Sequence, residues 1–237
     1  MSHYEQKKFV KIVVNQLDKL NNFKNMTVLD VGSYDVGGSI KEFFHNNYYL
    51  GVDLTKGPNV DVVLDGSQLE KLNKKFDIVI SCECFEHAKN WKKIFQSMYN
   101  VCKANGFVIF TCASRGRIEH GTVRTINSDS PGTDDNYYKN IFKREFEQSF
   151  NVNKLFKQSL LHYNVKSSDL YFFGSKEKHF KIDIQKINEA VKLIKNRNRK
   201  IKIFRIILSY LLNDINYQNF TFLRRKVKKF FMKKDNG

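Results

Sequence analysis

Acidic, glycine and polar residues stand where four short apolar runs of the sequence end. Glycines allow a backbone to pass close to a ligand, and a carboxylate can accept hydrogen bonds from both hydroxyls of a ribose. The pattern therefore indicates a site for a nucleoside-containing cofactor. The residues predicted to contact the cofactor are Asp30, Gly32, Ser33, Tyr34, Gly37, Asp53, Leu54, Asp65, Gly66, Cys82 and Glu83.

Two of these carboxylates have more specific expected roles. Asp53 follows the glycine turn by roughly 20 residues, the spacing of a ribose-binding acid, and Asp65 could receive the exocyclic amine of an adenine. Each also has a simpler interpretation, with Asp53 as a helix cap and Asp65 as a turn residue. Because all four strand ends carry suitable residues, we favour the cofactor site over these simpler roles.

Two histidines are candidate general bases. His87 follows the fourth apolar run, and His120 lies in a long polar segment. Histidine titrates near pH 6.5 and can therefore take a proton at working pH, which matters only if the acceptor must lose one. The alternatives are a capping or packing role for His87 and a loop-stabilising role for His120.

The long polar segment, residues 113–140, is rich in Gly, Ser, Thr, Asn and Asp. A connection of this length within a compact domain is usually functional. We expect it to cover the acceptor side of the site, where arginines would suit a carboxylate, phosphate or acidic sugar; ordinary solvated charges are the alternative. The predicted substrate-binding residues are Arg115, Arg117, Arg124, Tyr137 and Tyr138.

Apolar periodicity places these residues on an alternation of strands and helices, which indicates βαβ units and a mostly parallel sheet. Strands are expected at 26–31, 48–52, 60–64, 76–81, 107–112, 152–161 and 169–174. Helices are expected at 4–20, from Gly38 or Ser39 onward, and at 91–103, 142–150, 182–194, 201–212 and 224–234, with Asn105-Gly106 stopping the helix before the fifth strand.

The runs at 28–33, 49–53, 60–65 and 76–81, followed by Glu86-His87, resemble the class I S-adenosylmethionine-dependent methyltransferases, in particular the type 11 branch. The resemblance implies a Rossmann-like α/β fold: a seven-stranded, mostly parallel sheet with an antiparallel last strand and helices on both faces. It also implies S-adenosylmethionine as cofactor and S-adenosylhomocysteine as product. The glycine turn departs from the family pattern, because Gly32 is followed by Ser33-Tyr34-Asp35-Val36 before Gly37.

The competing interpretation of the strand pattern is a nicotinamide-dependent dehydrogenase, but its Gly-x-Gly-x-x-Gly spacing is absent. The predicted function is methyl transfer to a small molecule, a sugar, or a glycan or lipid-linked acceptor. The alternatives are an RNA methyltransferase and a noncatalytic, cofactor-binding scaffold that recruits partners through its basic tail.

The net charge of +17 is concentrated at the end of the chain, where residues 176–237 hold 18 Lys and Arg against 5 Asp and Glu. We therefore predict a methyltransferase domain at 1–175 and a basic amphipathic helical extension at 176–237. We expect the segment 182–234 first of all to pack on the domain or to form a homodimer. Contact with a membrane surface, of which basic amphipathic helices are typical, is the second possibility, and nucleic acid is the less favoured partner.

The composition also indicates where the protein is located and whether it contains disulfides or a metal site. No apolar run is long enough to cross a membrane, and residues 1–11 lack the pattern of a signal peptide. The cysteines Cys82, Cys84, Cys102 and Cys112 are expected to be reduced thiols, and no metal site is expected. We expect a cytoplasmic protein, with peripheral contact to the inner face of the membrane as an option.

Overall fold

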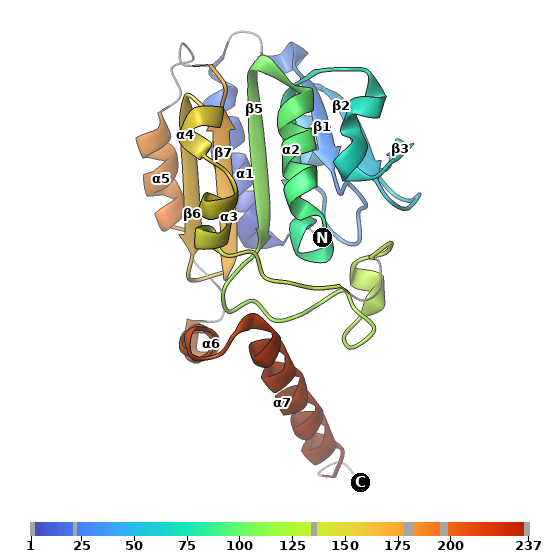
Figure 1. The fold of residues 1–237 in the computed structure, drawn as a ribbon, viewed down its shortest axis with the longest axis vertical. Coiled ribbons are helices and arrows are strands. Elements are labelled where there is room, and N and C mark those ends of the chain that lie inside the picture. The colour runs from blue at the N-terminus through green and yellow to red at the C-terminus, as the bar shows by residue number, and fades with distance from the viewer. Residues whose placement is uncertain (1–2, 21–22, 134–136, 178–182, 195–198, 235–237) are drawn as a thin grey trace.

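The computed structural model describes residues 3–20, 23–133, 137–177, 183–194 and 199–234. A seven-stranded sheet with the order β3-β2-β1-β4-β5-β7-β6 forms its centre (Figure 1). The strands are β1 (Thr27–Val31), β2 (Tyr48–Asp53), β3 (Val62–Val63), β4 (Phe76–Cys82), β5 (Cys102–Ala113), β6 (Gln158–Asn164) and β7 (Asp169–Ser175). This order confirms the predicted Rossmann-like sheet.

Strands β1 to β5 pair in parallel, whereas β7 runs antiparallel to both β5 and β6. The chain moves outward from β1 through β2 to β3, and then returns to the other side of β1 as β4. The strand order therefore reverses between β1 and β4, which is where open α/β sheets bind ligands at the carboxyl ends of the strands.

Helices cover both faces of the sheet. α1 (Tyr4–Leu17) and α5 (Ile184–Lys192) pack on one face, and α2 (Trp91–Val101), α3 (Lys143–Ser149) and α4 (Val152–Leu155) cover the other (Figure 1). Successive side chains of a strand point to opposite faces, so each strand contributes to both cores. Phe173 joins the core beneath α1 and α5, while Phe172 joins the aromatic core beneath α2 and α3.

Three local expectations differ from the structure. The helix expected after the first strand is only the 3₁₀ helix η2 (Lys41–Phe44), because the N–H groups of Gly37 and Gly38 donate to the Asp35 side chain and close the preceding turn instead of starting a helix. α2 ends at Val101, and Asn105-Gly106 lies within the extended start of β5. The strand expected from residue 152 starts as α4, whose first turn Asn151 caps.

Short 3₁₀ helices connect the larger elements: η1 (Phe23–Asn25), η3 (Gly66–Leu72), η4 (Phe85–His87) and η5 (Asn127–Asp129). Cys82, Cys84, Cys102 and Cys112 all lie in described segments, and no disulfide joins them. Among the described residues, no helix combines the length and apolar character that crossing a membrane requires.

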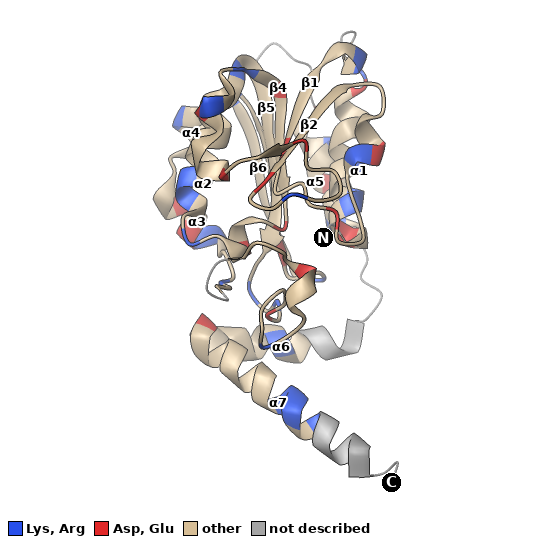
Figure 2. Cartoon of the chain, turned by 90° about the vertical axis from the view of Figure 1, so that its right-hand side faces the viewer, with Lys and Arg blue, Asp and Glu red and all other residues tan. Residues whose placement is uncertain are grey.

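The basic C-terminal region divides into two parts. α5 belongs to the sheet domain, because Ile187 and Val191 are buried in its core. α6 (Arg199–Leu211) and α7 (Asp214–Lys234) lie beyond the carboxyl ends of the strands, and α7 points away from the domain (Figures 1 and 2). The sheet domain thus extends past the predicted boundary at residue 175, and the protruding extension starts at α6. The basic break expected at 196–200 lies mostly outside the described residues.

We expect Ile187→Ala to lower the free energy of unfolding of the whole domain by about 2–5 kcal/mol, because a fully buried side chain is lost from the core. Leu193→Ala is the matched control, since Leu193 is 73% exposed on the same segment, and it should change stability by less than about 0.5 kcal/mol. Urea unfolding of both variants tests this, and equal stabilities would contradict the assignment of α5 to the core.

Candidate functional site

A cavity of about 230 Å³ opens at the carboxyl ends of β1, β2, β3 and β4, at the point where the strand order reverses. Its lining combines residues from all four strand ends with residues of the long loop after β5. The predicted cofactor residues in the lining are Gly32, Tyr34, Asp53, Leu54, Asp65, Gly66 and Glu83. Residues 129–133, Tyr137 and His87 complete the wall.

The turn after β1 brings backbone close to this cavity. Gly32 has a φ of +83°, and a side chain there would place its Cβ 2.8 Å from Cβ of Cys84. The N–H groups of Gly32 and Ser33 both donate to the carbonyl of Val52 (2.9 and 3.1 Å), which fastens the turn to β2. A glycine at position 32 is therefore required by both the conformation and the lack of space.

Asp53 presents its carboxylate to the cavity. Its Oδ2 accepts a hydrogen bond from the Tyr34 N–H (3.1 Å), and its Oδ1 accepts a longer one from the Thr55 N–H (3.4 Å). Burial raises the pKa of Asp53 above its ordinary value, although the backbone donors oppose this effect. A carboxylate has about four lone-pair sites, so these two bonds leave Asp53 able to accept more from a ligand.

Asp65 combines two of the roles considered from the sequence. Its Oδ1 accepts the Ser67 N–H (2.7 Å) and so caps η3, while the residue also lines the cavity. The cap fixes the side chain at the carboxyl end of β3. Asp65 is therefore both a structural cap and a cavity residue.

Three predicted cofactor residues that do not reach the main cavity line a smaller space beside it, together with Gly32 and Tyr34. Asp30, Ser33 and Cys82 border a pocket of about 10 Å³ beneath the glycine turn. The hydroxyl of Tyr49 donates to Asp30, and burial raises the pKa of Asp30 to about 7 despite this bond. The buried Ser33 Oγ has no hydrogen-bond partner in the structure.

Gly37 lies in the same turn without reaching either cavity. Its N–H donates to Asp35 Oδ1 (2.9 Å), as does the N–H of Gly38 (2.6 Å). Asp35 therefore closes the long turn that departs from the family pattern, and Gly37 serves that closure.

The two candidate bases meet beside the cavity. The rings of His87 and His120 lie 5.0 Å apart between centroids, and the Tyr138 ring contacts both (5.5 and 5.1 Å). His87 also lines the cavity, and its buried Nδ1 has no hydrogen-bond partner in the structure. Burial and the nearby His120 lower the pKa of His87 to about 3, so His87 is uncharged at neutral pH.

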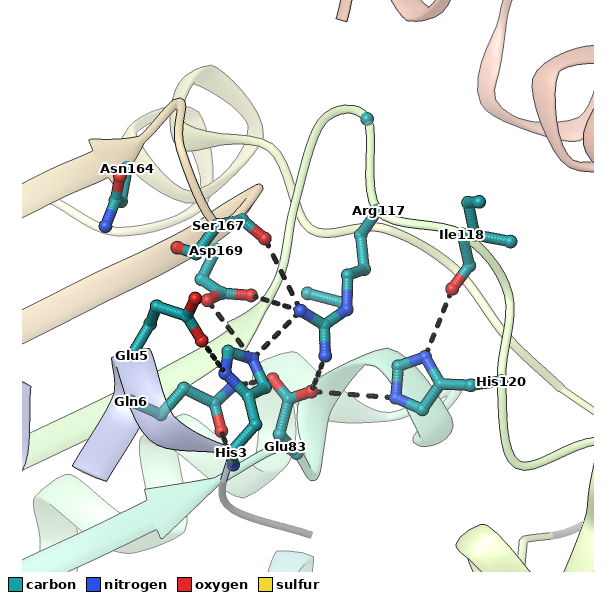
Figure 3. A network of polar contacts seen from close by, with 12 residues as sticks. His3, Glu5, Gln6, Glu83, Arg117, Ile118, His120, Asn164, Ser167 and Asp169 are labelled. Carbon is teal, nitrogen blue, oxygen red and sulfur yellow. Dashed lines mark hydrogen bonds and ion pairs between the residues drawn. The ribbon is translucent and has the colours of Figure 1, made fainter. Parts of the chain in front are cut away.

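Arg117 lies in a buried network of charged groups rather than on the cavity wall (Figure 3). Its guanidinium binds Glu83 Oε2 (3.1 Å) at the end of β4 and Asp169 Oδ1 (3.2 Å) at the start of β7. Gln6 of α1 also donates to Glu83, and His120 Nε2 lies 3.6 Å from the same carboxylate. The loop after β5 is thereby fixed to α1, β4 and β7.

The two neighbouring glutamates of this region have opposite pKa shifts. Glu83 is buried, but the charge of Arg117 and the hydrogen bond of His120 hold its pKa well below the ordinary value. Burial and the negative charge of Glu83 raise the pKa of Glu86 well above its ordinary value. Glu86 Oε1 accepts the Ala113 N–H (2.9 Å). A charged Glu83 beside a neutral Glu86 follows from the position of Arg117.

The other loop arginines also contact protein groups. Arg115 donates to the Ser209 carbonyl of α6 (2.6 Å), and its guanidinium lies 4.2 Å from the rings of both Phe142 and Tyr210. Arg124 pairs with Glu119 (2.9 Å) and donates to Asn219 Oδ1 of α7 (2.9 Å). Of the five predicted substrate residues, only Tyr137 lines the cavity, whereas Tyr138 packs against the two histidines.

Sequence reasoning missed two groups of residues. The segment 129–133 covers the cavity, and its Asp-Ser-Pro-Gly composition is a turn signal within a loop that we had expected to be functional. His3 and Gln6 reach the charged network from α1. Nothing in the local pattern distinguishes these two from ordinary polar residues at the start of a helix.

His3 gives this network a pH dependence. Burial and the charge of Arg117 lower the pKa of His3, but the charge of Asp169 (3.3 Å) and the hydrogen bonds with Asp169 and Glu5 together raise the pKa from 6.5 to about 9. Because the folded-state pKa is raised, this stabilisation is present below pH 6.5 and is lost as pH rises through 9.

We therefore expect His3→Gln to cost about 1–3 kcal/mol of stability at pH 6 and much less at pH 9.5. Urea unfolding across this pH range measures the difference. His45→Gln is the control, because His45 is exposed, and it should follow the pH dependence of the unmodified chain. A constant cost of His3→Gln at every pH would contradict a protonated His3 in the network.

The profile of a methyltransferase domain family matches residues 1–148, which is more than half of the chain. A protein of Invertebrate iridescent virus 6, named as a methyltransferase, is 25% identical over 224 residues, covering 84% of this chain and 78% of that protein.

Among solved structures, the CurJ carbon methyltransferase matches 73% of this chain with a TM-score of 0.51 and 10% identity. This chain spans 54% of that structure, so it matches only about half of that protein's length. The magnesium protoporphyrin IX methyltransferase of Synechocystis has a TM-score of 0.49 and 12% identity, over 73% of this chain and 80% of that one. At these identities, the likeness to CurJ shows the fold alone. The family match, together with the cavity at the strand ends, establishes that this chain belongs to the methyltransferase domain family.

Proposed function

We propose that the chain binds S-adenosylmethionine in the cavity at the strand ends and transfers its methyl group to a small-molecule, sugar, or glycan or lipid-linked acceptor. The observation that carries this proposal is the Asp53 carboxylate at the end of β2. It is held by the Tyr34 N–H, lies on the cavity wall and keeps acceptor sites for ribose hydroxyls.

The other lining residues fit the same cofactor. Gly32 lines the cavity, and a side chain at this position would collide with Cys84, which also lines it. Leu54, Leu64 and Ile94 supply apolar surface near Asp65, which suits a planar base whose amine meets a carboxylate. The unpartnered Ser33 Oγ lies in the turn that would face the amino-acid part of the ligand.

When bound, S-adenosylmethionine would supply a sulfonium methyl group, whose bond to sulfur breaks as the acceptor attacks the methyl carbon in line, with S-adenosylhomocysteine as the leaving group. The chain contributes by holding the acceptor in position and by excluding water. Residues 129–133 and Tyr137 close the cavity opposite the strand ends. The charged network at Arg117 fixes the position of the loop that carries them.

His87 is the polar side chain best placed to orient an acceptor. It lines the cavity, and its Nδ1 lacks a protein partner. A pKa of about 3 makes His87 a weak base but a permanently neutral hydrogen-bond partner near neutral pH. A neutral His87 can orient an acceptor by a hydrogen bond but removes a proton poorly. This favours an acceptor that does not have to be strongly deprotonated.

The loop arginines favour a small acceptor over RNA. Each loop arginine already binds a protein group. Arg115 binds a backbone carbonyl, Arg117 binds buried carboxylates, and Arg124 binds Glu119. Recognition of a phosphate backbone depends on cations that are available to phosphates. The arginines around this site are used to hold the loop instead.

We expect Asp53→Ala to weaken S-adenosylmethionine binding at least tenfold, the scale of lost hydrogen bonds to a charged group. Isothermal titration calorimetry with S-adenosylmethionine and with S-adenosylhomocysteine measures this effect. Asp18→Ala is the matched control, because Asp18 is exposed at the end of α1, and its affinity should equal that of the unmodified chain.

The results separate the alternatives. Binding that is unaffected by Asp53→Ala would remove the ribose assignment, and a folded chain that binds neither ligand would overturn the proposal. Cofactor binding without methyl transfer to any acceptor tested would favour the noncatalytic scaffold. Formation of S-adenosylhomocysteine with small acceptors, measured by mass spectrometry, would support the enzyme.

A further inference from the structure

The helices α6 and α7 expose a concentration of large apolar side chains. Seven of these side chains are more than half exposed: Ile203, Phe204, Ile207, Tyr210, Leu211, Ile215 and Leu223. Single exposed apolar residues are ordinary on a protein surface, whereas a cluster marks a contact surface. The spacing of four residues from Ile203 to Ile207 and Leu211 places these side chains along one side of α6.

The opposite sides of these helices are already used. Ser209 of α6 is buried, and its carbonyl accepts the hydrogen bond from Arg115. On α7, Tyr217 donates to the Gly116 carbonyl (2.8 Å), and Gln218 contacts the backbone of Arg117 and Glu119 (3.1 and 2.9 Å). The extension is therefore fixed to the loop in a defined orientation, with its apolar cluster directed away from these contacts.

The charge of the extension restricts what can cover this surface. Residues 199–234 contain eleven Lys and Arg and a single acidic residue, Asp214. Asp214 already accepts hydrogen bonds from the backbone and side chain of Asn140 (3.1 and 2.9 Å). Arg224, Arg225, Lys226 and Lys228 are exposed on the protruding part of α7, where the described residues carry no acid (Figure 2).

We propose that α6 and α7 form a docking surface for an anionic lipid bilayer, with the apolar cluster entering the interface and the cations contacting lipid head groups. Apolar side chains beside Lys and Arg are the composition of helices that lie on such a surface. Each cation near an anionic bilayer adds to the attraction. A second copy would bring two strongly basic extensions together, so its charge does not complement this surface.

The position of the surface relates it to the cavity. α6 and α7 lie at the end of the sheet where the loop after β5 runs (Figure 1). The loop that covers the cavity is joined to α7 by Arg124 with Asn219, and by Arg225 with the Glu119 carbonyl (3.4 Å). A bilayer that holds the extension would thereby be connected, through these hydrogen bonds, to the loop that closes the site.

Co-sedimentation of the full chain with vesicles tests the docking surface. Phosphatidylcholine vesicles are compared with vesicles containing equal parts of phosphatidylcholine and phosphatidylglycerol, at low and at high salt. We expect binding to the anionic vesicles that exceeds binding to the neutral ones at least tenfold and that weakens with salt. The measurement needs neither cofactor nor acceptor, so it is independent of the proposed methyl transfer.

Two variants locate the binding surface. Lys226→Glu with Lys228→Glu should reduce affinity for the anionic vesicles at least tenfold, because four units of charge change near the bilayer. Lys71→Glu with Lys93→Glu makes the same charge change at exposed lysines of the sheet domain and should retain binding. Leu223→Ser should reduce the part of the binding that persists at high salt. Thermal unfolding confirms that each variant is folded.

Three results would overturn the proposal. One is a folded chain that does not bind anionic vesicles, and a second is equal loss of binding in the Lys226/Lys228 and Lys71/Lys93 variants. The third is a stable dimer, detected by light scattering, that Leu223→Ser dissociates while vesicle binding is absent.

Discussion

The pairing of one guanidinium group with two buried carboxylates organises the region around the cavity. The side chain of Arg117 is only 22% exposed and binds Glu83 and Asp169, and the charges of these two carboxylates together raise the pKa of Arg117. Removing one partner of such a set would leave an uncompensated buried charge, which is strongly destabilising. The three residues come from β4, from the loop after β5 and from β7, so this pairing fixes the loop against the sheet.

The backbone around Glu83 shows how closely this region is determined. Glu83 has a φ of +55°, an unfavourable conformation for a residue other than glycine. The hydrogen bond from its N–H to the Thr111 carbonyl (2.9 Å) and the contacts of its side chain hold this conformation. The resulting turn directs Cys84 toward Gly32 and His87 toward the cavity. Such local strain persists only where surrounding contacts require it.

The sequence predicts well those features that depend on local pattern. The periodicity of Phe9, Val13 and Leu17 defines α1, and the apolar runs before Asp53 and Asp65 locate two strand ends on the cavity. Prediction from the sequence fails where the position of a side chain depends on residues that are distant in the chain. The contact of His3 with Asp169 spans most of the domain, and the contacts of Arg115 and Arg124 with α6 and α7 depend on the path of the extension. A basic residue in a polar loop looks the same in sequence whether it meets a ligand or a carbonyl.

The antiparallel strand β7 limits where the chain can be truncated. The family match ends at residue 148, before β6 and β7, yet β7 pairs with β5 from Phe107 to Ala113 and supplies Asp169 to Arg117. The carbonyls of Gly116 and Arg117 in turn receive their hydrogen bonds from α7. A fragment cut at the end of the matched region would expose an unpaired central strand edge, which is a template for aggregation. A fragment cut after α5 would remove the donor of the Gly116 carbonyl and one of the two donors of the Arg117 carbonyl, leaving the latter only Asn140. Both cuts would therefore remove contacts that hold the loop beside the cavity, so β7 and the C-terminal helices both contribute to the position of that loop.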